Sequence, residues 1–115
     1  MAESIPSDTV FVTIPELVER WGSTPSKIRR MIEDRYLAAV RIDGVLRIPA
    51  DFIHNDEPLH SLRGTLLVLH DAGFSDDEAV AWLLNMNEEL AEPPVAALRA
   101  GRKSAVRRAT QSLAF

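Results

Sequence analysis

Two helix-start signals follow one another closely near the beginning of the chain, and they limit its fold more than any other feature. Residues 13–16 (TIPE) have the Thr-x-x-Glu spacing of a capping box, with a proline inside the first turn. Gly22 ends this helix, and Thr24 and Pro25 begin another as N-cap and first helical residue. The sequence therefore predicts two short helices joined by a tight turn, with the second extending to about Asp34.

A hairpin signal comes directly after the second helix. The dipeptide Asp-Gly at 43–44 accepts the positive φ values of a tight turn, and apolar and β-branched residues flank it. We expect antiparallel strands at about 38–42 and 45–48. A strict two-residue loop would place Val40 opposite Arg47, and a longer loop would change the side that each arginine faces. Helix, turn, helix and a two-stranded wing is the order of a winged helix-turn-helix.

The rest of the chain predicts a helical half. Apolar spacing indicates a helix over 62–72, and a second capping box at 75–78 begins the next one. A short helix is expected over 94–100 and a basic last helix over about 104–113. We therefore expect a mainly α fold with a small two-stranded wing, in which a winged helix-turn-helix is followed by a C-terminal helical half.

These signals divide the chain into four parts. We expect a flexible leader over 1–10, a winged helix-turn-helix over 11–54, a connector over 55–61 and a C-terminal helical domain over 62–115. With 115 residues, of which 46% are hydrophobic, the chain can form one modest core or two small units that share one core.

The second helix separates an apolar side from a basic side. Ile28, Met31 and Ile32 fall together at helical spacing, and the opposite side centres on Arg29 and Arg30. An exposed basic helix face is usually only solvated, so its interpretation depends on the capped helix, glycine turn and wing around it. That order favours a recognition helix for DNA.

The basic side carries the groups that duplex DNA requires. Arg30 can pair bidentately with guanine O6 and N7, Ser26 can contact base edges, and Lys27 and Arg29 can reach phosphates. Backbone N–H groups at the helix start can bind a phosphate oxygen, and the wing can contact the backbone or the minor groove. The candidate DNA-binding residues are Thr24, Ser26, Lys27, Arg29, Arg30, Arg41, Gly44 and Arg47.

Segregated charge reconciles the net charge of −4 with DNA binding. Residues 20–50 contain seven basic and three acidic side chains, whereas residues 71–92 contain seven acids and no base. Residues 99–115 contain five bases and no acid. These last bases can contact phosphates or pair with the acidic stretch of the same half; they are Arg99, Arg102, Lys103, Arg107 and Arg108.

The stretch TIPELVERWGSTPSKIRRMIEDRYLAAVRIDGVLRIP combines a helix, a turn, a recognition helix started by Thr-Pro and a wing that ends in Arg-Ile-Pro. It resembles the excisionase and MerR-like winged helix-turn-helix domains. Over about residues 12–115 the chain is also similar to a family of small actinobacterial DNA-binding proteins that are substrates of the mycobacterial serine/threonine kinase L. The shared residues include Pro15, Gly22, Ser26, Lys27, Leu37, Ala39, Val40, Arg41, Gly44, Ile48, Pro49, Leu62, Leu69, His70, Asp71, Gly73, Trp82, Leu83, Val106, Arg107, Arg108 and Ala109.

Taken with the basic helix, this resemblance implies a partner in double-stranded DNA and a role in transcription regulation or nucleoid association. It also implies a kinase that modifies a threonine in an N-terminal extension. Ser7 and Thr9 are the candidates here, although neither matches the family position and an ordinary polar leader is the alternative. Added negative charge could fold back on the basic helix and oppose phosphate binding.

A rival interpretation concerns the C-terminal segment. Residues 94–106 resemble the C-terminal part of Xre-type antitoxins that bind ADP-ribosyltransferase-like toxins, although a helix-Gly-helix corner explains the same spacing. The alternative function is therefore a protein-interaction module that uses residues 94–115 as an antitoxin-like partner-binding surface.

Signals for catalysis, cofactors and membranes are lacking. His54, His60 and His70 have no ligand-like spacing, and His70 is interpreted as a hydrogen-bonded structural residue. There is no phosphate-binding glycine loop, nucleophile elbow or paired-carboxylate signature, so we expect neither an enzyme nor a cofactor or metal. The longest apolar run, 66–69, is too short for a bilayer, and the lack of cysteine fits a reducing compartment. We expect a cytoplasmic protein without a membrane segment.

Overall fold

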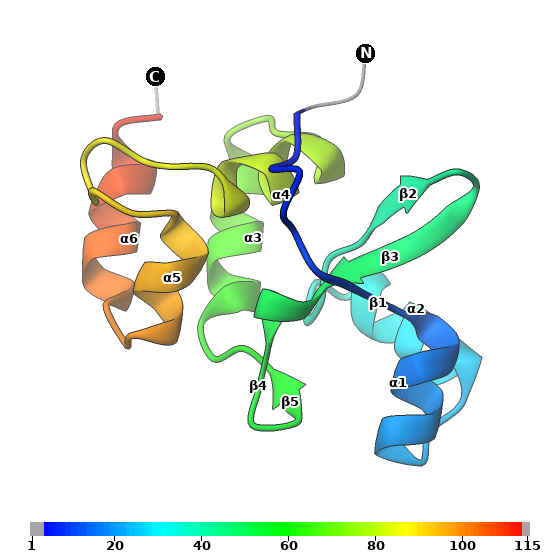
Figure 1. Ribbon diagram of the computed structural model, residues 1–115. Helices are drawn as coiled ribbons and strands as arrows, with labels where there is room; N and C mark the ends of the chain where they lie inside the picture. The colour runs from blue at the N-terminus through cyan, green and yellow to red at the C-terminus, as the bar shows by residue number, and fades with distance from the viewer. Residues whose placement is uncertain (1–3, 114–115) are drawn as a thin grey trace.

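Short helices and short strands alternate in the first half of the chain, and helices dominate the second half. The computed structural model describes residues 4–113. The elements in chain order are β1 (Phe11–Thr13), α1 (Ile14–Trp21), α2 (Pro25–Glu33), β2 (Val40–Ile42), β3 (Val45–Pro49), the 3-10 helix η1 (Ala50–Phe52), β4 (Ile53–His54), β5 (Glu57–Pro58), α3 (Leu62–Asp71), α4 (Asp76–Leu84), α5 (Pro94–Arg99) and α6 (Lys103–Gln111). Figure 1 shows α1, α2 and the wing at one end of the molecule and α6 at the other. The predicted fold class, mostly helical with a small wing, is confirmed.

The two helix starts have the caps that the sequence predicts. Thr13 accepts a hydrogen bond from the backbone N–H of Glu16, whose carboxylate accepts one from the N–H of Thr13. Gly22 ends α1 in the left-handed conformation, with φ of 57°. Thr24 caps α2 by accepting from the N–H of Lys27 at 3.2 Å. Local sequence thus determines where both helices begin and where α1 ends.

The wing has a strict two-residue loop. Val40 pairs with Arg47, and the turn residues Asp43 and Gly44 have φ of 52° and 78°, the left-handed values of a tight hairpin turn. The sequence did not predict a third strand, but β1 pairs with β3 on its other edge, with Thr13 opposite Arg47. The wing is therefore two strands of a three-stranded sheet, and β3 is the central strand.

The polar segment between the halves is more ordered than a plain connector. β4 and β5 form a small hairpin in which His54 pairs with Glu57. The two residues between the strands, Asn55 and Asp56, have φ of 53° and 58°. Arg99 of α5 donates hydrogen bonds to the carbonyl oxygens of Asp51 at 3.0 Å and of Ile53 at 2.8 Å. These bonds hold the hairpin base against the C-terminal helices.

One hydrophobic core extends through both halves. Its members range from Val12 in β1 to Ala109 in α6, and Phe52 between the halves is fully buried. Trp21, Phe74 and Trp82 also pack against the core and are partly buried. In the part of the chain that the structure describes, no helix has the length and hydropathy needed to cross a bilayer.

Residues 4–10 lie against the helical half. Ile5 packs on the core, and the side-chain amide of Asn85 donates a hydrogen bond to the carbonyl oxygen of Ser4 at 3.0 Å. This placement differs from the flexible leader predicted for residues 1–10, because sequence composition did not reveal the tertiary contact. Residues 1–3 lie outside the described residues.

Candidate nucleic-acid interface

The basic side of α2 faces solvent. Ile28 is fully buried beneath the helix, with Met31 and Ile32 partly buried beside it. The exposed side chains on the other side are Ser26, Lys27, Arg29, Arg30 and Glu33. Among residues 4–113, the cationic groups of Lys27, Arg29 and Arg30 have no ion-pair or hydrogen-bond partner. These three cations can therefore bind an anion without breaking an internal interaction.

The start of α2 supplies backbone donors less freely than the sequence predicted. The hydroxyl group of Thr24 already accepts the N–H of Lys27, and Pro25 has no N–H. Ser26 carries the remaining first-turn N–H, which has no internal acceptor within the described residues. Thr24 therefore holds the helix start in shape, and the backbone N–H of Ser26 is the first-turn donor that remains available to a ligand.

The two wing arginines do not act as a pair. Residues directly opposite one another share a face of the sheet and neighbours along a strand alternate. Arg41 is opposite Leu46, whereas Arg47 is opposite Val40, so the two arginines lie on opposite faces. Arg41 is exposed and donates a hydrogen bond to the carbonyl oxygen of Gly44 at 3.0 Å. Its guanidinium group therefore lies at the tip of the wing.

Arg47 is placed differently from Arg41. It lies on the central strand between Val40 and Thr13 and is partly buried. Its Nε atom is buried and has no hydrogen-bond partner within the described residues. Of the two wing residues, Arg41 is therefore the more accessible to DNA.

Two family models match consecutive parts of the chain. The model described as "DNA-binding protein Rv2175c, wHTH domain" matches residues 1–53, and "Rv2175c C-terminal domain of unknown function" matches residues 59–114. The DNA-binding protein Rv2175c of Mycobacterium tuberculosis (strain ATCC 25618 / H37Rv) is 31% identical to this chain, over 89% of this chain and 79% of the relative. The chain belongs to the Rv2175c family.

The family relationship extends to three dimensions. An NMR structure of Rv2175c matches this member of the family with a TM-score of 0.81 and 30% sequence identity. The match covers 99% of this chain and 92% of the other. The helix-turn-helix, the wing and the C-terminal helices therefore belong to one arrangement that both members of the Rv2175c family share.

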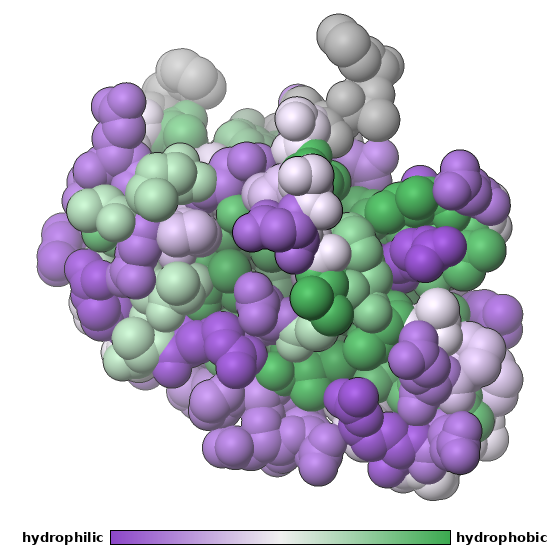
Figure 2. All heavy atoms as spheres, viewed as in Figure 1, coloured by the Kyte–Doolittle hydropathy of each residue, from purple (hydrophilic) through white to green (hydrophobic). Residues whose placement is uncertain are grey.

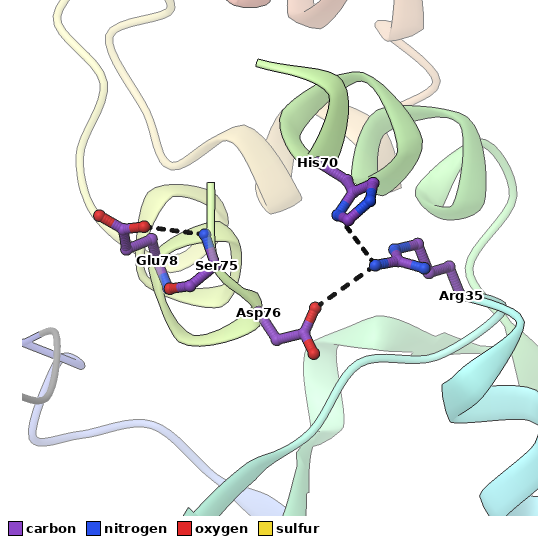
Figure 3. Close-up of polar contacts among 5 residues, drawn as sticks. All are labelled: Arg35, His70, Ser75, Asp76 and Glu78. Carbon is purple, nitrogen blue, oxygen red and sulfur yellow. Dashed lines mark hydrogen bonds and ion pairs between the residues drawn. The ribbon is translucent and has the colours of Figure 1, made fainter. Parts of the chain in front are cut away.

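In this Rv2175c-family chain, the end of α2 is fastened to the helical half. Arg35 donates a hydrogen bond from Nη2 to Nδ1 of His70 at 3.0 Å, and the same nitrogen lies 3.7 Å from a carboxylate oxygen of Asp76. Figure 3 shows His70 of α3 and Asp76 of α4 both pointing toward Arg35. Arg35 has the left-handed φ of 66°, which is uncommon for a residue with a side chain. Arg35 is therefore held by residues of the C-terminal half. Its hydrogen bond to His70 confirms the predicted interpretation of His70 as a hydrogen-bonded structural residue.

Arg63 of α3 makes a second connection to the end of α2. Its Nε donates to the carbonyl oxygen of Asp34 at 2.8 Å, and its guanidinium carbon lies 4.9 Å from the centre of the Tyr36 ring. Sequence reasoning missed the roles of Arg35 and Arg63. Their partners lie far along the chain, His70 being 35 positions after Arg35 and Asp34 being 29 positions before Arg63, and no local motif links them. Together they set the position of α2 relative to the C-terminal helices.

Replacing Arg63 with alanine removes one charge-assisted hydrogen bond and one cation–π contact. Because Arg63 is exposed, we expect the free energy of unfolding to fall by only about 1 kcal/mol. Urea unfolding followed by circular dichroism measures this change. Arg108→Ala is the control, since Arg108 is an exposed arginine with no partner within the described residues. Equal stability losses in both variants would contradict the role of Arg63.

The C-terminal basic residues divide into two groups. Arg102 forms an ion pair with Glu92, which confirms the predicted pairing with the acidic stretch for this residue. Arg99 is bound to backbone carbonyl groups, as described above. Lys103, Arg107 and Arg108 are exposed and have no partner within residues 4–113. These three remain available to an external anion.

The phosphorylation candidates in residues 4–10 differ in exposure. Ser7 is exposed, whereas Thr9 is partly buried and its hydroxyl group donates to the carbonyl oxygen of Pro6 at 2.6 Å. Phosphorylation of either residue stays a prediction.

Among the described residues, no group of three or more His, Asp or Glu side chains is placed to hold a metal ion.

Proposed function

We propose that this chain binds duplex DNA with α2 in the major groove and the wing beside it. One observation carries the proposal: on the side opposite its buried Ile28, α2 presents three exposed cations that have no partner among residues 4–113. An α-helix fits the width of the major groove, so the exposed basic side of α2 can face the base edges while its buried side packs on the core. The name of the M. tuberculosis relative, a DNA-binding protein, supports the same function.

The residues of α2 have different roles in this proposal. Arg30 reads a guanine through its planar donor fork, and Ser26 contacts a base edge or a phosphate. Lys27 and Arg29 bind phosphates and fix the register of the helix on the duplex. Glu33 is exposed in the last turn and repels phosphate, so the first two turns approach the DNA most closely.

The wing supports this orientation. Arg41 and Gly44 at its tip contact the sugar-phosphate backbone or the minor groove, while the half-buried Arg47 reaches a phosphate with its terminal nitrogens. Thr24 contributes through the helix cap. The proposal also divides the chain into a winged helix-turn-helix over 11–54, a connector over 55–61 and a C-terminal domain over 62–115. The two family models support that division, because one ends at residue 53 and the other begins at residue 59.

A single winged domain contacts few base pairs, so useful specificity requires a dimer or another DNA-binding partner. We infer that the protein regulates transcription or associates with the nucleoid. Phosphorylation of Ser7 or Thr9 by a serine/threonine kinase would add negative charge to a segment that lies on the helical half. Ser7 is the more accessible of the two.

Two measurements test the proposed binding of duplex DNA. Bound duplexes are selected from a random pool, and the selected duplex is then titrated at two salt concentrations. We expect affinity to fall steeply with salt, because phosphate contacts release counterions. The selected duplex should bind more tightly than a scrambled one of equal length. Salt-insensitive binding, or recovery of a stoichiometric protein partner without DNA affinity, would instead favour a protein-interaction module that uses residues 94–115.

Replacing Lys27 with alanine should weaken all duplexes alike. The variant loses one phosphate contact but no base contact, so the slope of log affinity against log salt should decrease in magnitude by about 1. Fluorescence anisotropy on the selected and scrambled duplexes measures both quantities. Arg108→Ala serves as the control, because it removes one positive charge from α6, at the other end of the molecule (Figure 1). A change in sequence preference would assign Lys27 to base recognition.

A further inference from the structure

A pocket between α3 and α6 lies outside the proposed DNA interface. Its volume is about 320 Å³, within the size range of small-molecule sites. The residues that line it are Ser61, Gly64, Thr65, Val68, Lys103, Ser104, Arg107 and Thr110. α6 lies at the end of the molecule away from α2 (Figure 1), so this pocket does not face a duplex bound by the recognition helix.

The charge of the pocket is positive. Lys103 and Arg107 are four residues apart on α6, which places them on the same side of the helix. Among residues 4–113, no acidic residue lines the pocket, and neither cation has an ion-pair or hydrogen-bond partner. The preceding base, Arg102, pairs with Glu92. The fold therefore uses Arg102 internally and leaves the two pocket cations for a ligand.

Hydroxyl groups in the pocket supply further hydrogen-bond donors beside these two cations. Thr65 and Thr110 donate to the backbone carbonyl oxygens of Ser61 and Arg107, so their hydroxyl protons are already used. The hydroxyl groups of Ser61 and Ser104 have no such bond within the described residues. The pocket therefore offers two cationic groups and two hydroxyl donors to one anion.

Gly64 keeps one wall of the pocket open. It lies inside α3 without a positive φ, so the backbone does not require glycine there. A Cβ atom at this position would have no atom within 4 Å, so packing does not require glycine either. Glycine lowers helix stability relative to alanine. Its effect here is to leave space beside Lys103 and Arg107.

We propose that this pocket binds a small phosphate-bearing ligand, with the phosphate between Lys103 and Arg107. Cations and hydroxyl groups are the partners that phosphate oxygens require. A second hollow of about 560 Å³ shares Val68, Arg107 and Thr110 with the pocket and continues toward Leu113. This extension is large enough for the remainder of a ligand the size of a mononucleotide. Asp71 lines only the extension, so the phosphate belongs at the Lys103 end.

Amide chemical shifts in NMR spectra of the full chain test the proposal. The probes are inorganic phosphate and adenosine monophosphate, each compared with sodium chloride of equal ionic strength. We expect saturable shifts in α3 and α6 with one or both phosphate probes and none with chloride. In the double variant Lys103→Ala/Arg107→Ala, affinity should fall about tenfold or more, because two charge-assisted contacts are lost.

Arg108→Ala is the matched control, because Arg108 is the neighbouring exposed arginine on α6 that does not line the pocket. It should retain the affinity of the original chain, and circular dichroism should show that all variants remain folded. Shifts that follow ionic strength, or that persist in the double variant, would overturn the proposal. Shifts in α3 and α6 with a DNA duplex but with neither small probe would also overturn it and would assign the pocket to a second DNA segment.

Discussion

Replacing Arg30 with alanine is expected to weaken binding to the selected duplex by about 1–3 kcal/mol and to relax the preference at one base position. Arg30 lies on the exposed side of α2, and its guanidinium group makes no ion pair or hydrogen bond within the described residues. A bidentate pair with guanine depends on the planar fork of this group. Competition titrations against duplexes that carry each base substitution measure both effects.

The Arg30→Lys variant separates geometry from charge. Lysine keeps the positive charge but lacks the two parallel donors, so discrimination at that base should fall while general affinity falls less. Thermal unfolding should be unchanged in both variants, because the side chain is exposed. Equal losses on all sequences would place Arg30 on a phosphate, and unchanged affinity would remove α2 from the interface.

Replacing Phe52 with alanine should have the largest effect on stability. Phe52 is fully buried in η1, at the point where the winged domain joins the C-terminal half. Truncating a buried phenylalanine removes apolar contact area and leaves a cavity, so the free energy of unfolding should fall by about 3–5 kcal/mol. Denaturant unfolding followed by circular dichroism measures this loss.

The two tryptophans show whether the loss reaches both halves. Trp21 ends α1 and Trp82 lies in α4, so Trp21→Phe and Trp82→Phe backgrounds make fluorescence specific for one half. Because one core extends through both halves, Phe52→Ala should lower the midpoint of both signals together. The control is Val45→Ala, at a wing residue that is 43% exposed. A shift in one signal alone would show that the halves unfold independently.

Hydrophobic and hydrophilic side chains gather on different parts of one face of the molecule. Figure 2 shows hydrophilic side chains at the lower right of the molecule, where α1 lies, and hydrophobic residues gathered over the centre of this face and over part of the wing. The exposed apolar residues include Val10 and Val45, which are 70% and 43% exposed. The wing therefore presents apolar as well as charged side chains to solvent, with Val45 and Arg41 both exposed.

Most of the local structure was predictable because its signals lie within a few residues of one another. The caps at Thr13 and Thr24 and the turn at Gly22 involve neighbours in sequence, and the structure has each of them. The Asp-Gly turn predicted the wing but left its register open, and the structure shows the two-residue loop that pairs Val40 with Arg47. The separation of Ile28 from the basic side of α2 follows from helical spacing alone.

Contacts between distant segments were not predictable in this way. β1 consists of only three β-prone residues, too short a run to predict a strand or its partner, yet it completes the sheet by pairing with β3. Asn85 binds the carbonyl oxygen of Ser4, and Arg63 binds that of Asp34, so in both cases a side chain meets a backbone atom far away in sequence. A backbone carbonyl is present at every position, which is why no residue pattern identifies such a partner.

The sequence by itself determined the two capped helices, the turn between them, the Asp-Gly turn of the hairpin and the basic side of α2. Each depends on intrinsic conformational preference or helical spacing. Only the tertiary structure decided that Arg35 and Arg63 hold the end of α2, that Arg41 and Arg47 lie on opposite faces of the sheet, and that Lys103 and Arg107 line a pocket with α3. These outcomes depend on how the halves pack, because packing determines which charges meet a partner and which remain available to a ligand.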